Sequence, residues 1–511
     1  MNSQQNKFQT ACENGRVDIV RLLLADSRVN PGDENNIAIK HACQRGHVDV
    51  VRLLLADSRV NPAEHYNLAM RLACQNGHID VVRLLLADKR VNPADFHNDA
   101  MRKACKYGHV DVVRLLLADD RVNPASNHNH AIRWASKNGH ADVVRLLLAD
   151  HRVNPADYNN YAIRLACENG HVDVVRILLA DSRVNPADFH NDAMRKACKY
   201  GHVDVVRLLL ADDRVNPASN HNHAIRWASK NGHADVVRLL LADHRVNPAD
   251  YNNYAIRLAC ENGHVDVVRI LLADSRVNPT NYYNHAMSMA CKKGHVDVVR
   301  LLLADGRVNP ADKSNEAIDL ACENGHIDVV RLLLADARVN STNFYNVAIK
   351  RACENGHVDV VRLLLADDRA NPVDEFKLAI QMACLNHHVD IVCLLLMDAR
   401  VDICHVVSTW PYIVKKYSED ESFCALLALA GLEPYCNKWG LLDSSVHNLD
   451  VLRYWQTTSY INLYNHNDKL WNGPYGILLK HRLKVAELYR SAALVSRLPV
   501  EMIELVLEYV K

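Results

Sequence analysis

Residues 160–190 read NYAIRLACENGHVDVVRILLADSRVNPADFH, and most of the chain consists of copies of this 31-residue stretch. The glycine of its central Gly-His pair recurs every 31 residues from Gly15 to Gly356, and His387 takes the glycine position in the last copy. Thirteen copies without an insertion or deletion fill residues 1–403 of a 511-residue chain. A fixed period of this size is typical of a solenoid, which grows by stacking units rather than by adding separate cores.

Each unit contains two segments in which apolar residues follow helical spacing, residues 162–167 and residues 172–179. Gly170 and the histidine after it end the first helix and begin the second. Pro155 lacks an N–H group and biases the preceding asparagine toward extended geometry, so it ends the second helix of its unit. The pattern therefore predicts an all-α fold of helix-turn-helix units.

An asparagine precedes the first helix of nearly every unit, as Asn160 does in the quoted stretch. Its side chain can accept a hydrogen bond from an otherwise unpaired backbone N–H, or the residue can adopt left-handed φ and ψ angles. The sequence leaves both roles open. The equivalent positions are Asn36, Asn67, Asn98, Asn129, Asn191, Asn222, Asn253, Asn284, Asn315 and Asn346.

The unit resembles the ankyrin repeat, because Gly-His, a following Val-Val-x-Leu-Leu-Leu helix and a downstream Val-Asn recur together over residues 1–403. The resemblance implies antiparallel helix pairs stacked into a curved solenoid of about 13 repeats, with extended fingers along one edge. Two features depart from the family pattern. The usual Thr-Pro-Leu-His helix opening is replaced by sequences such as Tyr161-Ala-Ile-Arg164, and the period is 31 instead of 33. We therefore expect short fingers without a regular β-hairpin.

Histidine occupies one position of the unit in twelve copies, and Arg16 takes it in the first copy. A position that recurs in every layer serves the stack rather than a single metal or catalytic site. The ankyrin resemblance implies that this imidazole bonds to backbone groups between neighbouring units. These residues are His47, His78, His109, His140, His171, His202, His233, His264, His295, His326, His357 and His388.

Eleven of the 15 cysteines also share one position, from Cys12 to Cys384, and Ser136 and Ser229 take it in two further units. Stacked helices lie roughly 8–10 Å apart, beyond the Cα separation of about 7 Å that limits a disulfide. No Cys-x-x-Cys pair offers zinc-ribbon spacing. We expect small buried thiols, no disulfide and no metal.

Lysine plus arginine and aspartate plus glutamate both number 60, so the net charge is zero. Without a global field the chain is not drawn to nucleic acid or to acidic lipid. No apolar run approaches the roughly 18 residues of a membrane span, and the first residues lack a signal sequence. We expect a monomer in the cytoplasm, which would be a host cytoplasm if the source is a virus. Motifs of nucleotide-binding, metalloprotease and hydrolase sites are absent from the sequence, so we predict no enzyme, no catalytic residue and no cofactor.

Residues 90–186 and residues 183–279 are identical, with an offset of three units. No residue in this stretch is unique, which argues against a single active site. Aromatic, histidine and asparagine side chains gather in the segment assigned to the fingers, where they are either drifting surface residues or a protein-binding surface. The predicted partner-binding residues are Phe96, His97, Asp99, His128, His130, Tyr158, Tyr161, Phe189, His190, Tyr251, Tyr254, Tyr282, Tyr283, Phe344 and Tyr345.

The composition changes after Asp402, and four of the six tryptophans lie in the last fifth of the chain. Residues 447–455 match the second helix of the unit in their Leu, Asp, Val and Arg positions. We interpret residues 404–465 as degenerate repeats or a cap, since terminal units have to cover the exposed core. Residues 466–511 are predicted to form a helical tail, so that the array ends in an α-helical C-terminal cap.

The segment Leu498-Pro-Val-Glu-Met-Ile-Glu-Leu-Val-Leu-Glu-Tyr-Val510 has a proline at a helix start and an amphipathic pattern. It resembles the opening of an F-box, and the shortened F-box that ends many ankyrin proteins of large DNA viruses. The resemblance implies docking to a Skp-type adaptor of a ubiquitin ligase, and the alternative is that this is simply the last helix of the cap. The residues implied for docking are Leu498, Pro499, Met502, Ile503, Val506 and Leu507.

These observations lead to two functional hypotheses. The first is a non-enzymatic scaffold that binds other proteins through finger residues and the inner helix face. The alternative is a substrate-recruiting adaptor of a cullin-RING ubiquitin ligase, in which the array captures a target and the C-terminal segment binds the ligase.

Overall fold

A computed structural model describes residues 3–339, 345–367 and 376–396. These residues form 26 α-helices and no strand. The predicted all-α repeat fold is therefore confirmed for the described residues. The chain divides into two compact units, the first ending at Asn281 and the second beginning at Tyr282. Among the described helices, none combines the length and the apolar character that a membrane span requires.

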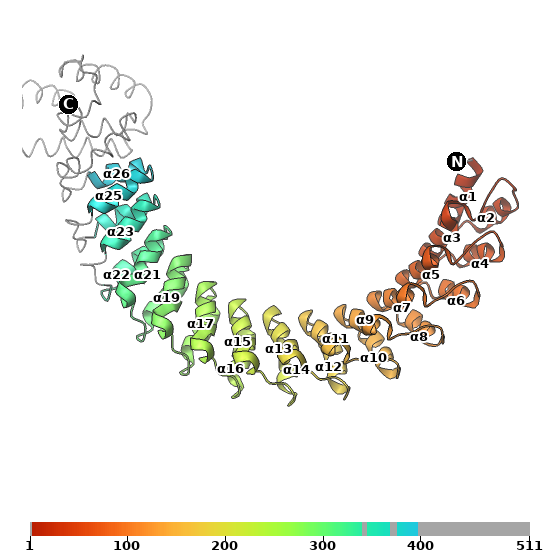
Figure 1. Ribbon diagram of the computed structural model, residues 1–511, viewed down its shortest axis with the longest axis horizontal. Helices are drawn as coiled ribbons and strands as arrows, with labels where there is room; N and C mark the ends of the chain where they lie inside the picture. The colour runs from red at the N-terminus through yellow and green to blue at the C-terminus, as the bar shows by residue number, and fades with distance from the viewer. Residues whose placement is uncertain (1–2, 340–344, 368–375, 397–511) are drawn as a thin grey trace, which may run out of the picture. The chain divides into compact units, whose positions relative to one another are not determined.

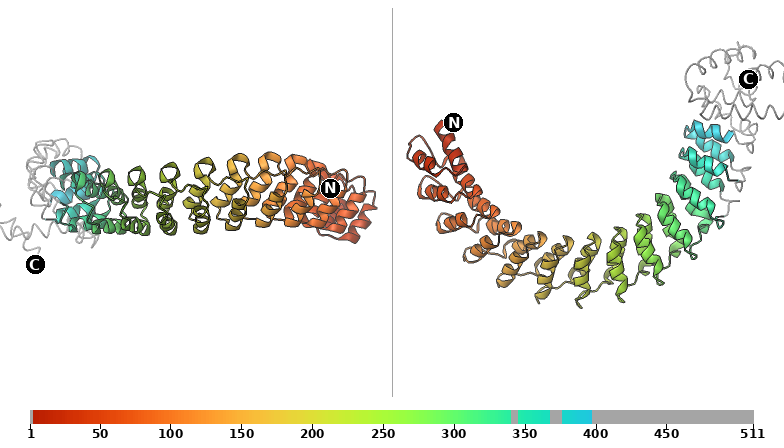
Figure 2. Two further views of the ribbon diagram at one scale, coloured as in Figure 1. Left: turned by 90° about the horizontal axis from the view of Figure 1, so that it is seen from below. Right: turned by 180° about the vertical axis from the view of Figure 1, so that it is seen from behind.

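The first compact unit consists of two layers of helices. Each odd-numbered helix packs beside the next odd-numbered helix, and each even-numbered helix beside the next even-numbered one. The odd-numbered layer lies on the inner side of the bend of this unit (Figure 1), and the views from below and behind show the same succession of pairs (Figure 2). The helices are α1 (Ser3–Glu13), α2 (Val17–Leu24), α3 (Asp33–Arg45), α4 (Val48–Ala56), α5 (Glu64–Asn76), α6 (Ile79–Ala87), α7 (Asp95–Tyr107), α8 (Val110–Leu117), α9 (Ser126–Lys137), α10 (Ala141–Ala149), α11 (Asp157–Glu168), α12 (Val172–Ala180), α13 (Asp188–Tyr200), α14 (Val203–Leu210), α15 (Ser219–Lys230), α16 (Ala234–Ala242), α17 (Asp250–Glu261) and α18 (Val265–Ala273).

The second compact unit repeats this arrangement. Helix α21 packs on α23 and α23 on α25, while α20, α22, α24 and α26 follow one another in the other layer. The predicted boundary at residue 403 and the proposed segments 404–465 and 466–511 lie outside the described residues. The helices are α19 (Asn281–Lys293), α20 (Val296–Ala304), α21 (Asp312–Glu323), α22 (Ile327–Ala335), α23 (Tyr345–Glu354), α24 (Val358–Leu365), α25 (Phe376–Leu385) and α26 (Val389–Leu396).

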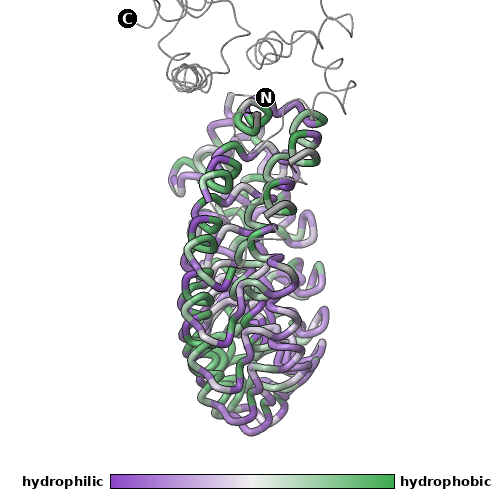
Figure 3. The backbone as a smooth tube through the Cα atoms, turned by 90° about the vertical axis from the view of Figure 1, so that its left-hand side faces the viewer, coloured by the Kyte–Doolittle hydropathy of each residue, from purple (hydrophilic) through white to green (hydrophobic). Residues whose placement is uncertain are grey.

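A continuous apolar core lies between the two layers. In α11 and α12 the buried residues recur at helical spacing, so each helix turns one apolar face toward its neighbours. The backbone coloured by hydropathy alternates between hydrophobic stretches and hydrophilic turns (Figure 3). Each buried Leu, Ile or Val contributes roughly 1.5–3 kcal/mol of transfer free energy. Within the repeat of residues 160–190, the buried apolar residues are Ala162, Ile163, Leu165, Ala166, Cys167, Val174, Val175, Leu178 and Val184.

The Gly-His pair links each unit to the one before it. The imidazole Nε2 of His202 donates a hydrogen bond to the Glu168 carbonyl oxygen of the preceding unit, 2.9 Å away. Gly170 ends α11 with φ of +76°, and a Cβ atom there would lie 2.6 Å from Nδ1 of the same His202 ring. The glycine therefore serves both the left-handed turn and the close approach of the next histidine. The inter-unit role expected for the histidines is confirmed for His47 to His264 and for His326 to His388.

Arginines after nine of the even-numbered helices, from α4 to α22, make a second link between repeats. In the loop after α12, Arg183 forms a bidentate ion pair with Asp181, with Nε 2.9 Å from Oδ1. Its Nη1 and Nη2 groups also donate to the carbonyl oxygens of Val153 and Leu148 in the preceding unit, at 3.0 and 2.9 Å. The hydrogen bond from Arg183 lowers the pKa of Asp181 below its usual range. One guanidinium thus stabilises its own loop and joins two units.

We predict that Gly170→Ala destabilises the array while Gly306→Ala does not. The Gly170 substitution places a side chain at φ of +76° and against His202, whereas a Cβ at Gly306 meets nothing within 4 Å. A residue forced into such a conformation should lose more than about 1 kcal/mol of unfolding free energy. Urea denaturation of the full chain, followed by circular dichroism, compares the two variants directly. Equal unfolding curves would show that the glycine contact is not needed.

Candidate partner-binding surface

Each odd-numbered helix from α3 to α19 begins with three consecutive residues in the left-handed backbone conformation. In α11 these are Tyr158, Asn159 and Asn160, with φ of 54°, 58° and 54°. The Asn160 N–H donates to the Ala156 carbonyl oxygen at 2.9 Å and closes the turn. Such a turn costs L-residues roughly 1–2 kcal/mol each, and asparagine tolerates it better than most. Asn160 therefore adopts the left-handed conformation considered for it.

The buried asparagine at the third position offsets this cost by binding the next unit. The Oδ1 atom of Asn160 accepts a hydrogen bond from the Asn185 N–H at 2.8 Å, and its Nδ2 group donates to Asp188 at 2.9 Å. The same pattern joins Asn129 to Asn154 and Asp157. Asn160 therefore does satisfy a backbone N–H, but that N–H belongs to the following unit and not to its own helix. Strained turns persist where the surrounding contacts determine them in this way.

The predicted partner-binding residues lie in this left-handed turn and directly after it. Residues such as Phe96 and Tyr158 have non-helical backbone angles and come just before the regular turns of the odd-numbered helices. The ring at the first position of the turn points away from the core, as the exposed fraction of 60% for Tyr158 shows. The other exposed predicted residues are Phe96, His97, His128, Phe189, His190, Tyr251, Tyr282 and Tyr283.

The remaining predicted residues have different surroundings. His130, Tyr161 and Tyr254 are half-buried just after the turn. Asp99 is buried and accepts hydrogen bonds from Arg71 at 3.1 Å and Arg102 at 2.7 Å, so its carboxylate serves the stack rather than an exposed contact. Phe344 lies outside the described residues, as does the docking segment from Leu498 to Leu507, and Tyr345 is described only as the first residue of α23.

Aromatic side chains of adjacent units contact one another along the first compact unit. The rings of Tyr66 and Phe96 have centroids 5.8 Å apart, and His128 lies 6.3 Å from Tyr158. Ring pairs at such distances are favourable by about 0.5–1.5 kcal/mol. We select one exposed ring per repeat, at the first or second position of the turn, and call this series the aromatic ladder. Its members in the first compact unit are Tyr66, Phe96, His128, Tyr158, Phe189, His221 and Tyr251.

In four repeats the arginine that follows the Ala-Ile or Ala-Met pair lies against a ring of the ladder. The Arg164 guanidinium carbon is 5.0 Å from the Tyr161 ring centroid and 4.7 Å from that of Phe189. Arg71 lies 5.1 Å from the Phe96 ring in the same manner. Cation–π contacts of this kind hold the guanidinium plane and leave the rings in a defined orientation.

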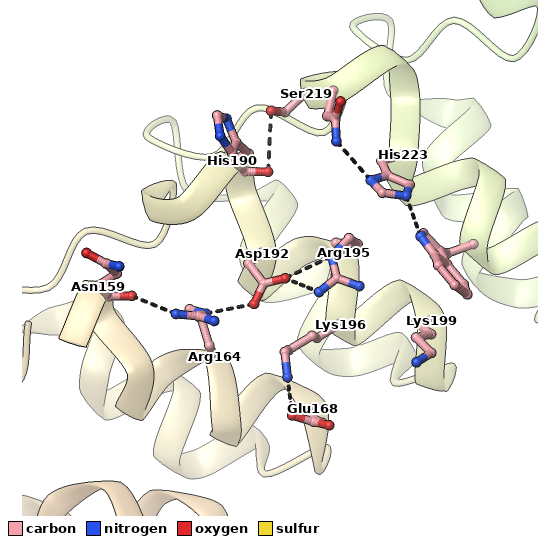
Figure 4. A network of polar contacts seen from close by, with 12 residues as sticks. Asn159, Arg164, Glu168, His190, Asp192, Arg195, Lys196, Lys199, Ser219 and His223 are labelled. Carbon is pink, nitrogen blue, oxygen red and sulfur yellow. Dashed lines mark hydrogen bonds and ion pairs between the residues drawn. The ribbon is translucent and has the colours of Figure 1, made fainter. Parts of the chain in front are cut away.

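A network of charged residues runs along the inner layer below the ladder (Figure 4). Asp192 is buried, and its carboxylate binds both Arg164, at 2.7 Å, and Arg195. Burial raises the pKa of Asp192, and the two arginines lower it by more, so that the net shift is downward. The next turn of the same face carries the ion pair of Lys196 with Glu168. These carboxylates are already used within the array.

Two equivalent histidines on this face, His130 and His223, are neutral near pH 7. Burial, together with Arg133 and Arg102, lowers the pKa of His130 to about 4. Burial and nearby arginines likewise lower the pKa of His223 to about 4. The neutral ring of His223 accepts a hydrogen bond from the Trp227 indole N–H (Figure 4). These histidine side chains are therefore neutral and take part in hydrogen bonds instead of carrying positive charge.

The eleven repeated cysteines are free and buried, as predicted. Burial raises the pKa of the Cys167 thiol above its usual range, which makes it unreactive. Among the residues that the structure describes, no group of three or more His, Cys, Asp or Glu side chains could hold a metal ion. The Asp173–Arg176 ion pair is exposed, with 3.3 Å between Nη1 and Oδ1.

Family models cover nearly all of the described helices. Models described as ankyrin repeats (3 copies) match residues 8–95, 70–160, 134–221, 211–281 and 256–344, and a model described as ankyrin repeats (many copies) matches residues 349–396. The matches span more than half of the chain. The chain belongs to the ankyrin repeat family. Ankyrin repeat proteins are typically non-enzymatic scaffolds for protein interactions. A comparison with curated proteins finds no match to this ankyrin protein.

Two sets of arginines in the ankyrin array make contacts between repeats that are not predicted from the sequence. The arginines of the Ala-Asp-x-Arg-Val-Asn segment, such as Arg183, reach back to the preceding unit, and their recurrence in register could have indicated this role. The pairing of Arg164 with Asp192 joins positions 28 residues apart and appears only where the following unit carries an aspartate. In the sequence, this pairing would be indicated by an arginine in one repeat occurring together with an aspartate 28 residues later, in the next repeat.

We predict that acid destabilises the ankyrin array partly through His130 and His223. In the unfolded chain a histidine titrates near pH 6.5, whereas the folded values are about 4. Between these values the unfolded state binds the extra protons, so the stabilising contribution is complete above about pH 6.5 and is lost as pH falls through 4. A His130→Gln, His223→Gln variant should therefore lose fewer degrees of melting temperature than wild type between pH 7 and pH 4.5. The matched control replaces the exposed His128 and His221, and it should follow wild type. Parallel curves for all three proteins would contradict this assignment.

Proposed function

We propose that this protein is a non-enzymatic scaffold that binds partner proteins through the aromatic ladder and the adjoining inner layer. The distribution of exposed apolar side chains carries the proposal. Seven of the twelve large hydrophobic side chains exposed among the described residues lie in the left-handed turn of an odd-numbered helix. Exposed apolar residues gathered in one place mark interaction surfaces, whereas single scattered ones need no explanation. The seven are Tyr66, Phe96, Tyr158, Phe189, Tyr251, Tyr282 and Tyr283.

The energetics of the turn support the same function. A strained backbone holds each ring outward, and the buried asparagine fixes the turn to the next unit, so the rings lose little freedom when a partner binds. Tyrosine and histidine supply contact area together with adaptable hydrogen bonds. We place the protein in the cytoplasm, in keeping with eleven free cysteines, because thiols stay reduced in that compartment.

We predict that alanine at Tyr158, Tyr161, Tyr251 and Tyr254 removes most of the protein capture of the full chain. The substitutions remove Tyr158 and Tyr251 of the ladder together with the adjoining Tyr161 and Tyr254, and none of the four is a buried core residue. A pull-down from cell lysate with the tagged full chain measures the effect, with circular dichroism as a check of folding. The matched control replaces Tyr107 and Tyr200, which are also exposed tyrosines but lie at the ends of α7 and α13. Ligands that persist in the four-alanine variant would refute the ladder as the binding surface.

A second candidate function rests on the sequence pattern of the C-terminal segment, which lies outside the described residues. The Leu-Pro-x-Glu start and the apolar positions at Met502, Ile503, Val506 and Leu507 favour a helix that docks into a groove of a Skp-type adaptor. In that case the array recruits a substrate and the segment binds a cullin-RING ubiquitin ligase.

We predict that a Leu498→Ala, Ile503→Ala variant melts within a few degrees of wild type yet no longer co-purifies with a Skp-type adaptor. Loss of a buried Leu or Ile in a cap would instead cost about 2–5 kcal/mol each. Differential scanning calorimetry and co-purification with the purified adaptor separate the two cases. A Glu504→Ala variant, altered at the rim of the same segment, should bind normally. A large fall in melting temperature, or adaptor binding that survives, would leave the scaffold function alone.

A further inference from the structure

Two copies of a cluster of cationic and aromatic side chains lie on the inner layer of the first compact unit. Each copy combines residues from three consecutive odd-numbered helices, and the two copies are 93 residues apart because they fall in the duplicated sequence. We call each of them a basic aromatic patch. The first consists of Lys106, Arg133, Trp134, Lys137, Tyr158 and Tyr161, and the second of Lys199, Arg226, Trp227, Lys230, Tyr251 and Tyr254.

Aromatic rings hold the cations of each patch. The Arg133 guanidinium carbon lies 5.5 Å from the Tyr158 centroid and 5.7 Å from that of Tyr161. The ammonium groups of Lys106 and Lys137 lie 4.8 and 5.2 Å from the Trp134 centroid. The second patch has the same geometry, with Arg226 at 5.3 and 5.8 Å from its two tyrosines, and lysines at 5.1 and 5.2 Å from Trp227.

The cations of the patches form no direct ion pair within the described part of the chain, and the charge of Arg226 contributes to lowering the pKa of Asp250. No carboxylate of the described residues lies within 4 Å of a side-chain nitrogen of the two arginines or the four lysines of the patches. The neighbouring acids are already engaged. Asp99 binds Arg71 and Arg102, Asp192 binds Arg164 and Arg195, and Asp157 accepts a hydrogen bond from Asn129 at 2.8 Å.

The arginine of each patch retains donors for a ligand. The Arg133 Nη2 group donates to the Asn127 carbonyl oxygen at 2.9 Å, and Arg226 makes the equivalent bond at 2.8 Å. Nη1 of each arginine makes no hydrogen bond among the described residues. A guanidinium held beside aromatic rings, with Nη1 still available as a donor, can bind a carboxylate.

We propose that each basic aromatic patch binds an acidic segment of a partner protein, and that the array therefore holds two such segments three units apart. This inference rests on the proposed scaffold function, since the occupant is part of a protein. It adds the chemistry of that occupant and the number of binding sites. The zero net charge of the chain means that a general field does not attract acidic peptides, so binding should be confined to local clusters.

The ring surroundings favour an acidic peptide over single-stranded nucleic acid. Bases bind by stacking on open aromatic faces. The Trp134 ring already has two ammonium groups within 5.2 Å and the His130 ring stacked at 5.7 Å. A base would have to displace these groups, whereas a carboxylate can approach the cations from outside the ring.

Titration of the full chain with an octaglutamate peptide tests the proposal by isothermal calorimetry. We expect two equivalent sites in the wild-type chain. Arg133→Gln should leave one site of unchanged affinity, and Arg133→Gln with Arg226→Gln should leave none. The matched control, Arg176→Gln with Arg269→Gln, alters another pair of arginines in the duplicated sequence, which pair with Asp173 and Asp266 on exposed faces of α12 and α18, and should keep both sites. Circular dichroism of each variant verifies folding.

A bivalent peptide tests the spacing of the patches. Three layers at roughly 8–10 Å each place the patches about 24–30 Å apart, and a Gly-Ser linker of about 25 residues has a similar mean span. Two octaglutamate segments joined by this linker should bind at least tenfold more tightly than one segment. The Arg133→Gln chain should lose this gain completely.

The outcomes separate this inference from the proposed function. No octaglutamate binding, a stoichiometry other than two, or a stoichiometry unchanged by Arg133→Gln would overturn the inference. Tighter binding of an oligothymidylate through the same arginines would also overturn it, in favour of nucleic acid. If proteins are still captured through the tyrosines while octaglutamate fails to bind, only the inference falls. If octaglutamate binds at two sites but the four-alanine variant captures all its proteins, the proposed function falls.

Discussion

The hydrogen bond from each histidine to a carbonyl oxygen of the preceding unit is the contact on which the array depends. It requires a glycine at the end of the preceding odd-numbered helix, because the imidazole occupies the volume of a Cβ atom, 2.6 Å from Nδ1 at Gly170. The histidine and the glycine it contacts in the preceding repeat must therefore be separated by the same number of residues in every repeat. A residue added or removed between them would misplace every later layer, which explains why the period stays at 31 without exception. The last described unit obeys the same rule, since His387 adopts φ of +62° at the glycine position.

The exposed surface follows from these internal contacts. The asparagine at the third position of the turn binds the next repeat through its side chain. This contact holds the two residues before it in a conformation that projects their side chains outward. Positions one and two of the turn are then free to vary, and the described residues there include Tyr, Phe, His, Asn, Glu and Lys. The scaffold is uniform where units meet and variable where a partner can reach it. This division lets a repetitive protein present a specific surface.

Much of the fold could be predicted because the repeat averages out local ambiguity. The helix pairs, the role of His202 and the buried state of Cys167 all follow from residues that recur in register. The left-handed turn at Tyr158 could not be predicted, because propensity disfavours three left-handed residues in a row. Asp99 was misjudged because its burial depends on two arginines from different units, and a single unit does not reveal them.

The duplication has a consequence for how the chain reaches its native state. Helices α5 and α6 pack against α7 and α8. The residues of α7 and α8 recur unchanged 93 positions later, in α13 and α14. A folding chain can therefore join the unit that ends near residue 89 to the one that begins near residue 183, with all local bonds satisfied and three units looped out. The quality of the junction does not distinguish this misassembled form from the native one. The two forms differ only in the core that the three omitted layers bury. The native order is therefore favoured because it forms more interfaces between repeats.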